Sequence, residues 1–168
     1  METEALSFSV GQILEIAEKL EHNGAQFYTR MAKLFFDARR WNLCKDLADW
    51  RAGRELALAQ RRKKFYSQET KFRPIDSGDY LQIHADVMAD LAVFADKLYP
   101  AHTLTGRESP SEIAKEAIAK TKDAIAFYCG LKNFARNQEA RAALDQIIAE
   151  EQGYMRVLGE KLFYSRFL

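Results

Sequence analysis

The sequence predicts an all-α protein whose fold is a bundle of four long helices, arranged as two helical hairpins. Three observations support this prediction. Signals for the start of a helix recur 100 residues apart, and apolar residues follow each start at steps of three and four. The chain holds only eight glycines and three prolines among 168 residues, which suits long uninterrupted helices. A chain of this length fits one domain, 1–168, with its own core.

The first hairpin is predicted over residues 9–66, with helices near 9–36 and 39–66. Ser9 is the expected N-cap of the first helix, and Gln12 is its capping-box partner three residues later. The apolar face of this helix follows at helical spacing: Ile13, Ile16, Ala17 and Leu20. A single hairpin cannot bury such a stripe alone, so we expect it to pack face to face with a second hairpin.

A long crossover, residues 67–108, separates the two hairpins. It begins with polar residues and Pro74, which do not continue a helix. Residues 77–79 supply a cap, and apolar residues at helical spacing predict one further helix over 79–98. The crossover is therefore expected to contain an extra helix.

The second hairpin is predicted over residues 109–164, with helices near 110–135 and 137–164. Its start has an N-cap serine, a proline at the first helical position and a capping-box glutamate: Ser109, Pro110 and Glu112. Apolar residues at helical spacing follow this start, as they follow the start of the first hairpin.

The two hairpins are related by an offset of 100 residues without a gap. In the first copy, the residues that recur identically at this offset are Ile13, Ala17, Phe27, Tyr28, Gly53 and Leu58. The helix starts, the aromatic pair and the helix ends agree at the same offset. We interpret this agreement as the internal duplication of a helical hairpin.

Charge and cysteine content narrow the classes of function. A formal net charge of +1 gives no overall field that would attract nucleic acid or an anionic membrane. The one strong basic run, 61–64, falls where cations complement the C-terminal end of a helix. Cys44 and Cys129 stand far apart and are interpreted as small apolar residues. Without a signal-peptide pattern or ~20 consecutive apolar residues, a cytoplasmic protein with no nucleic-acid or membrane partner is expected.

Four segments resemble the core helices of the rubrerythrin-like branch of the ferritin-like superfamily. They are residues 20–28, 47–54, 123–128 and 147–154. The resemblance implies the ferritin-like topology, in which two hairpins are joined by a long crossover. It also implies a di-iron centre inside the bundle and, as is common among such bundles, a homodimer.

A di-iron bundle of this kind takes one Glu from each of two helices and a Glu-x-x-His pair from each of the other two. Residues three apart share a helix face, so a carboxylate and an imidazole can hold one iron together. By the resemblance, six positions of this chain correspond to that ligand set: Glu21, Arg51, Arg54, Thr121, Glu151 and Tyr154. Glu21 and Glu151 are thus remnant metal ligands, whereas the other four positions have lost theirs.

Arg51 and Arg54 decide how this pattern is interpreted. A guanidinium group stays protonated at any workable pH and cannot ligate iron. Two arginines and two glutamates at these positions could keep the bundle centre neutral without metal. We therefore hypothesise a buried network that joins the arginines to Glu21 and Glu151. The alternative is a rotation of the second helix that turns both arginines to solvent and Trp50 inward.

The sequence therefore predicts a rubrerythrin-related protein with a non-catalytic structural, binding or regulatory role. No catalytic or cofactor-binding residue is identified, no cofactor is expected, and the protein partner is unknown. The alternative is a metal-binding oxidoreductase with a reduced or rearranged site, in which Glu21 and Glu151 hold iron or another divalent metal. The aromatic residues are expected to pack in the core, with a small apolar ligand cavity as the alternative.

Overall fold

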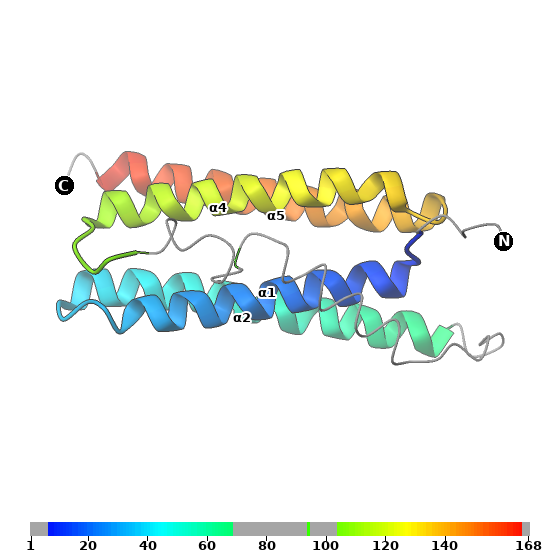
Figure 1. Cartoon of the computed structure of the whole chain (residues 1–168), viewed down its shortest axis with the longest axis horizontal. Helices are drawn as coiled ribbons and strands as arrows, with labels where there is room; N and C mark the ends of the chain where they lie inside the picture. The colour runs from blue at the N-terminus through cyan, green and yellow to red at the C-terminus, as the bar shows by residue number, and fades with distance from the viewer. Residues whose placement is uncertain (1–6, 69–93, 95–103, 166–168) are drawn as a thin grey trace, which may run out of the picture.

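Four long helices make up most of the chain that the computed structural model describes, which is residues 7–68, 94 and 104–165. They are α1 (Val10–Ala32), α2 (Ala38–Gln68), α4 (Pro110–Leu131) and α5 (Gln138–Ser165). Figure 1 shows α1 and α2 as one antiparallel hairpin and α4 and α5 as a second hairpin that lies along the first. The predicted all-α class and the helical bundle are confirmed for these residues.

The crossover is described only in part. The helix predicted over 79–98 lies outside the described residues, apart from Phe94. The Phe94 ring is buried and its centroid lies 5.9 Å from those of both Phe27 and Tyr28. The crossover thus contributes at least this side chain to the core of the first hairpin. Among the described helices, none combines the length and the apolar composition needed to cross a lipid bilayer.

The predicted start signals begin the first helix of each hairpin. Ser9 Oγ accepts from the Gln12 amide at 3.3 Å, and the Gln12 side chain accepts from the Ser9 amide at 2.7 Å. Ser109 and Glu112 form the same capping box, with distances of 3.2 and 2.7 Å. Both boxes satisfy backbone N–H groups that have no partner within the helix.

The helix ends differ from the predicted boundaries. The α1 helix ends at Ala32 instead of residue 36, because the chain turns there and Asp37 begins α2 by accepting from the Arg40 amide at 3.0 Å. The α4 helix ends at Leu131 instead of residue 135, because the last turn tightens into the 3-10 helix η2 (Lys132–Phe134). Asn137 then caps α5, accepting from the Ala140 amide at 2.8 Å. Short polar side chains in the turns set both boundaries.

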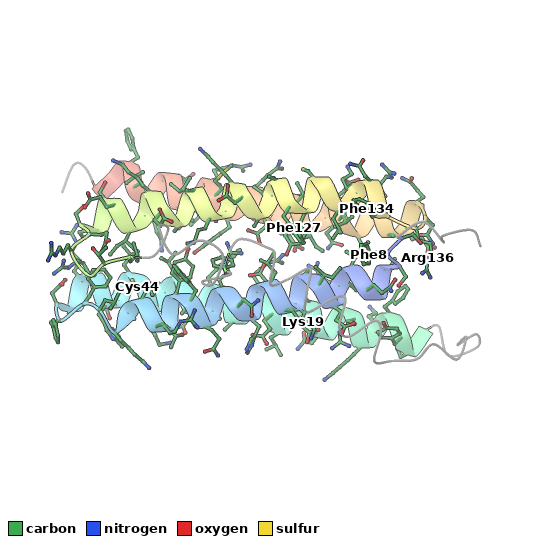
Figure 2. All side chains as sticks on the ribbon, in the orientation of Figure 1. Phe8, Lys19, Cys44, Phe127, Phe134 and Arg136 are labelled. Carbon is green, nitrogen blue, oxygen red and sulfur yellow. The ribbon has the colours of Figure 1, made fainter. Side chains whose placement is uncertain are left out.

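The N-terminal segment ties the two hairpins together at one end of the bundle. The Phe8 amide donates to the Phe134 carbonyl at 2.7 Å, and the Arg136 amide donates to the Phe8 carbonyl at 2.9 Å. Phe8 itself is buried, so this short bridge also seals the core. Figure 2 shows Phe8, Phe134 and Arg136 gathered at this end.

The buried positions of the two hairpins also match at an offset of 100 residues. Five such pairs are Ile13 and Ile113, Ala17 and Ala117, Tyr28 and Tyr128, Leu47 and Ile147, and Leu58 and Leu158. Cys44 is buried as expected, whereas Cys129 is exposed on α4, which corrects its interpretation as a core residue. The matching positions place the same faces of the two hairpins against each other.

Candidate functional site

A layer of buried polar side chains crosses the bundle, and each of its four members comes from a different helix. They are Glu21 from α1, Arg51 from α2, Thr121 from α4 and Glu151 from α5. Arg51 is 1% exposed and the other three are 0% exposed. All four stand at positions that the resemblance assigned to the ligand set.

Arg51 lies between the two carboxylates. Its Nη1 atom is 3.3 and 3.1 Å from the two carboxylate oxygens of Glu21, and 3.0 and 3.2 Å from those of Glu151. Its Nη2 atom donates to Thr121 Oγ1 at 3.2 Å. Thr121 in turn donates to the Ala117 carbonyl at 2.8 Å, which leaves its oxygen able to accept from the guanidinium. The hypothesised contacts of Arg51 with both acids are present, and Arg51 does not turn to solvent.

An aromatic shell surrounds this guanidinium. Its Cζ atom lies 4.8 Å from the ring centroid of Trp50, 5.1 Å from that of Phe94 and 5.7 Å from that of Tyr154. These rings exclude water and attract the cation through their faces. Gly24 makes room for this arrangement, because a Cβ atom there would lie 3.0 Å from the Phe94 ring and 3.2 Å from Arg51 Cδ.

Arg54 divides its contacts between the buried layer and the surface. Its Nε atom is 3.9 Å from Glu21 Oε1, and its Nη1 atom donates to Glu150. Arg61 also donates to Glu150, so this carboxylate is clamped by two arginines. The hypothesis that Arg54 joins the central acids is therefore only partly right. Glu150, one residue before the buried Glu151, is its main partner.

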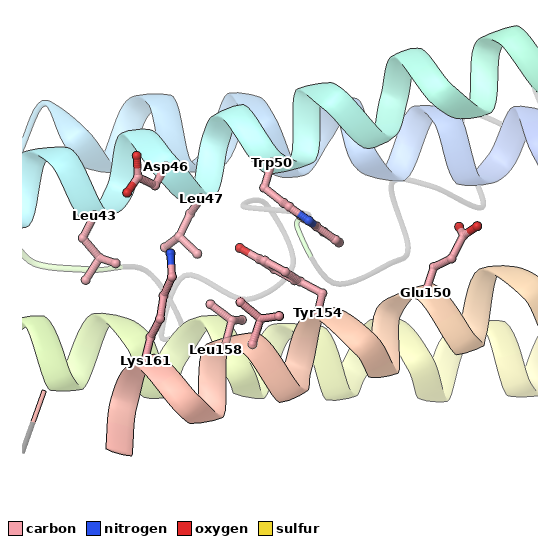
Figure 3. Close-up of a pocket in the computed structure, with 9 residues that line it drawn as sticks. Leu43, Asp46, Leu47, Trp50, Glu150, Tyr154, Leu158 and Lys161 are labelled. Carbon is pink, nitrogen blue, oxygen red and sulfur yellow. The ribbon is translucent and has the colours of Figure 1, made fainter. Parts of the chain in front are cut away.

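Tyr154 stands at a lost histidine position and is half-buried. Its ring stacks on Trp50 with centroids 3.3 Å apart and planes 6° from parallel. A pocket of about 280 Å³ lies beside this stack, as Figure 3 shows. Its lining residues are Leu43, Asp46, Leu47, Trp50, Glu150, Tyr154, Val157, Leu158 and Lys161. The stack thus separates a surface pocket from the buried charges.

Burial and mutual repulsion change the acid–base properties of the layer. Burial raises the pKa of Glu21 to about 8, with the neighbouring Glu151 adding to the shift and Arg51 opposing it. Burial disfavours the charged form of Arg51, but Glu21 and Glu151 outweigh burial and raise its pKa. At neutral pH this raised pKa keeps the Glu21 carboxyl largely protonated beside Arg51.

Lys120 is a buried cation that the sequence analysis missed. It is 6% exposed on α4, and its Nζ atom lies 4.4 Å from the ring centroid of Phe27 and 3.9 Å from Glu116 Oε1. Its signal was present in the offset of 100 residues, because Lys120 corresponds to the buried Leu20. A charged residue thus stands in the second hairpin where the first hairpin has an apolar core residue, and it packs against an aromatic ring.

The residues of this layer do not fit the pair of irons that the resemblance implies. A permanently protonated nitrogen lies where both carboxylates converge, and iron would have to displace it. The buried polar atoms without a hydrogen-bond partner among the described residues are chiefly N–H donors: Arg51 Nε, Arg54 Nε, Arg54 Nη2 and Tyr128 Oη. Metal binding requires lone pairs, not N–H groups. Within the described chain, no group of three or more His, Cys, Asp or Glu side chains could hold a metal ion.

Comparison with known proteins finds no family model, curated protein or solved structure that matches this chain. The resemblance to rubrerythrin-like proteins therefore depends on the sequence segments that carry it. The geometry of the buried layer depends on no resemblance.

Proposed function

We propose that this chain is a ferritin-like protein of the rubrerythrin type in which an arginine has taken the place of the metal. Its role is then structural, binding or regulatory, and not catalytic. One observation carries the proposal: Arg51 Nη1 lies 3.0 to 3.3 Å from all four carboxylate oxygens of Glu21 and Glu151. A guanidinium nitrogen thus makes the bridging contacts that a metal would make between these two acids.

The repeated pattern of the two hairpins supports the ferritin-like part of the proposal. Capping boxes at Ser9 and Ser109 and the buried positions recur at the same offset of 100 residues. Duplication of a hairpin, followed by a long crossover between the copies, is the architecture of this superfamily. Arg51 and Glu151 are equivalent residues of the two copies and contact each other at the centre.

The arginine supplies what a bound metal would otherwise supply to the fold. Two acids buried on opposite hairpins need a positive partner, because an unpaired buried carboxylate costs several kcal/mol. Arg51 is that partner, and it also joins α4 through Thr121. A bundle of this kind holds its four helices together without a cofactor. Its structural, binding or regulatory role is then performed by its surfaces.

Metal analysis tests the proposal directly. Protein produced in iron-rich medium and purified without chelators should contain far less than one iron per chain, and its melting temperature should not change when EDTA is added. A content of about two irons per chain, the stoichiometry of a di-iron bundle, would overturn the proposal. So would a melting temperature that falls in EDTA, because it would make a metal part of the fold.

A gain-of-function variant tests the ancestry. The ligand set is restored by four substitutions together: Arg51→Glu, Arg54→His, Thr121→Glu and Tyr154→His. We expect this variant to bind iron at about two ions per chain. Adding Glu21→Gln to it is the matched control and should weaken that binding, whereas a quadruple variant that folds but does not bind iron would argue against a di-iron ancestor.

The alternative function is a metal-dependent oxidoreductase with one ion at Glu21 and Glu151. The convergence of both carboxylates on one point favours it. It requires Arg51 to swing away, so it predicts that Arg51→Ala binds a divalent ion more tightly than the wild type does. This alternative would be supported over the metal-free bundle if the wild type contained about one metal ion per chain and Glu151→Gln contained none.

A further inference from the structure

The turn between α1 and α2, together with the start of α2, exposes three large apolar side chains within eight residues. Phe36 is 103% exposed, Trp41 43% and Leu34 38%. Figure 1 shows this turn at one extreme end of the bundle, where α1 and α2 meet. Apolar side chains gathered in this way on a surface indicate a contact with another apolar phase.

The turn presents Phe36 rigidly. Next to it, Phe35 is buried, and its amide donates to the Ala32 carbonyl at 3.2 Å. The Arg40 guanidinium lies 5.1 Å from the centre of the Phe35 ring, bonds to the Asp37 carboxylate, and donates to the Glu108 carbonyl at 3.3 Å. Phe36 thus projects between anchored neighbours.

A second segment, residues 104–108, packs against the turn. Gly106 has a φ of +89°, and a Cβ atom there would lie 3.1 Å from the Leu34 carbonyl oxygen. Only glycine adopts this backbone conformation readily and allows so close an approach. Leu104 of the same segment is buried. The turn is therefore a fixed feature of the fold.

Positive charge flanks the exposed rings. Lys33 and Arg39 are exposed on either side of Phe36, and Arg107 is exposed on the supporting segment. Two acids lie in the same segments: Asp37 is bonded to the Arg40 side chain, and the Glu108 carboxylate accepts from the Thr105 and Gly106 amides. The four basic residues of these segments (Lys33, Arg39, Arg40 and Arg107) outnumber these two acids. An apolar tip with basic flanks matches a surface whose outer layer is anionic and whose interior is apolar.

We propose that this turn docks on the surface of an anionic lipid bilayer. Phe36 enters the boundary between headgroups and acyl chains, Trp41 lies at the headgroup level where its amphipathic ring is favoured, and Lys33 and Arg39 contact lipid phosphates. The proposal is independent of the buried layer. It concerns contact with a membrane surface, which revises the expectation of no membrane partner; the absence of a spanning helix among the described residues is unaffected.

The shape of the turn favours a bilayer over a second copy of the chain. A stable protein interface buries about 800 Å² on each partner, and it needs a matching hollow for each projecting ring. A tight turn at the end of a bundle offers a small convex tip instead. A bilayer accepts such a tip without a preformed hollow, and binding through one tip should be weak, reversible and sensitive to salt.

Tryptophan fluorescence tests the proposal. The chain has two tryptophans, so Trp50→Phe leaves Trp41 as the only reporter. Titration with vesicles of equal parts phosphatidylglycerol and phosphatidylcholine should shift the Trp41 emission to the blue, and added salt should reverse the shift. Vesicles of phosphatidylcholine alone should give a much smaller shift. No shift with the anionic vesicles, or an equal shift with both kinds, would overturn the proposal.

Matched variants separate the tip from the rest of the surface. Phe36→Ser should weaken vesicle binding about tenfold or more, because a Phe side chain no longer leaves water. Phe134→Ser removes an exposed ring at the opposite end of the bundle and should leave binding unchanged.

The basic residues are tested in the same way. The pair Lys33→Gln and Arg39→Gln should weaken binding, whereas the pair Lys63→Gln and Lys64→Gln at the far end of α2 should not. Equal losses of vesicle binding in the tip and control variants would refute the proposal that the tip binds the bilayer. So would a dimer that forms without lipid and dissociates in Phe36→Ser, because the tip would then be a contact between two copies of the chain.

Discussion

Arg51 shows why the centre of the buried layer requires the geometry of arginine. Its Nη1 atom contacts both carboxylates while its Nη2 atom reaches Thr121 at 3.2 Å. Lysine has a single nitrogen on a flexible stem and could not make both sets of contacts from one position. The planar guanidinium therefore joins α1, α2, α4 and α5 through one side chain.

Removing this side chain should destabilise the fold strongly. Arg51→Met leaves Glu21 and Glu151 buried without their cation, and we expect the free energy of unfolding to fall by about 3 kcal/mol or more. Urea denaturation at pH 7 measures this loss. The triple variant that adds Glu21→Gln and Glu151→Gln should recover much of it, because neutral amides need no cation. Arg39→Met is the exposed control and should change stability by less than about 0.5 kcal/mol; a similar small effect at Arg51 would disprove the role given to it.

The sequence predicted the centre of the site better than its edge. Arg51 faces both acids, as hypothesised from the positions that the resemblance assigns to the inner face of the bundle. Spacing could not predict that Arg54 turns to Glu150. A one-residue step rotates Glu150 about 100° from the inner face, but the arginine stem is long enough to follow it outward. Side-chain reach is decided by packing, which the sequence pattern does not contain.

Helix boundaries show the same division between what the sequence predicts and what it does not. Ser9 and Ser109 begin their helices as predicted, because a capping box is a local signal that involves residues only three apart. The ends of α1 and α4 were predicted up to four residues too late. Asp37 and Asn137 set the following starts, but apolar residues such as Phe35 continue the helical spacing through the turn and conceal them.

Two glycines within helices provide a test of packing at the level of the element. A Cβ atom at Gly53 would meet nothing within 4 Å, whereas one at Gly24 would lie 3.0 Å from the Phe94 ring and 3.2 Å from Arg51 Cδ. Gly53→Ala should raise the free energy of unfolding by about 1 kcal/mol through helix propensity. Gly24→Ala should lower it, because the crowded ring and guanidinium outweigh the same gain. Thermal and urea unfolding followed by circular dichroism would check both, and stabilisation at Gly24 would show that the aromatic shell yields easily.

Across the whole molecule, the two hairpins share their apolar positions and differ in their charges. Buried residues recur at an offset of 100, yet Glu21 corresponds to Thr121 and Arg51 to Glu151. The all-α bundle could be predicted because apolar periodicity extends over whole helices and averages out local exceptions. The charged residues could be located from the sequence, but the raised pKa of Glu21 could not be predicted, since it depends on burial and on the distances to Arg51 and Glu151.

The raised pKa of Glu21 predicts how the stability of the whole fold depends on pH. The pKa of Glu21 is about 8 in the folded chain and near 4.5 when the side chain is in water, so the folded state holds more protons than the unfolded state between these values. The resulting stabilisation is fully present below about pH 4.5 and is lost as the pH rises through about 8. Glu150, whose pKa is lowered by Arg61 and Arg54 against the effect of burial, acts in the opposite sense and loses its stabilisation as the pH falls.

Urea unfolding at a series of pH values from 5 to 9 would measure this dependence. The wild type should lose stability steadily from pH 5 to pH 8, and Glu21→Gln, which has no proton to lose there, should show a flatter profile over the same range. Glu116→Gln on α4 is the control, and its profile should follow that of the wild type. A wild-type profile that is flat or rises over this window would contradict the raised pKa of Glu21 in the folded chain.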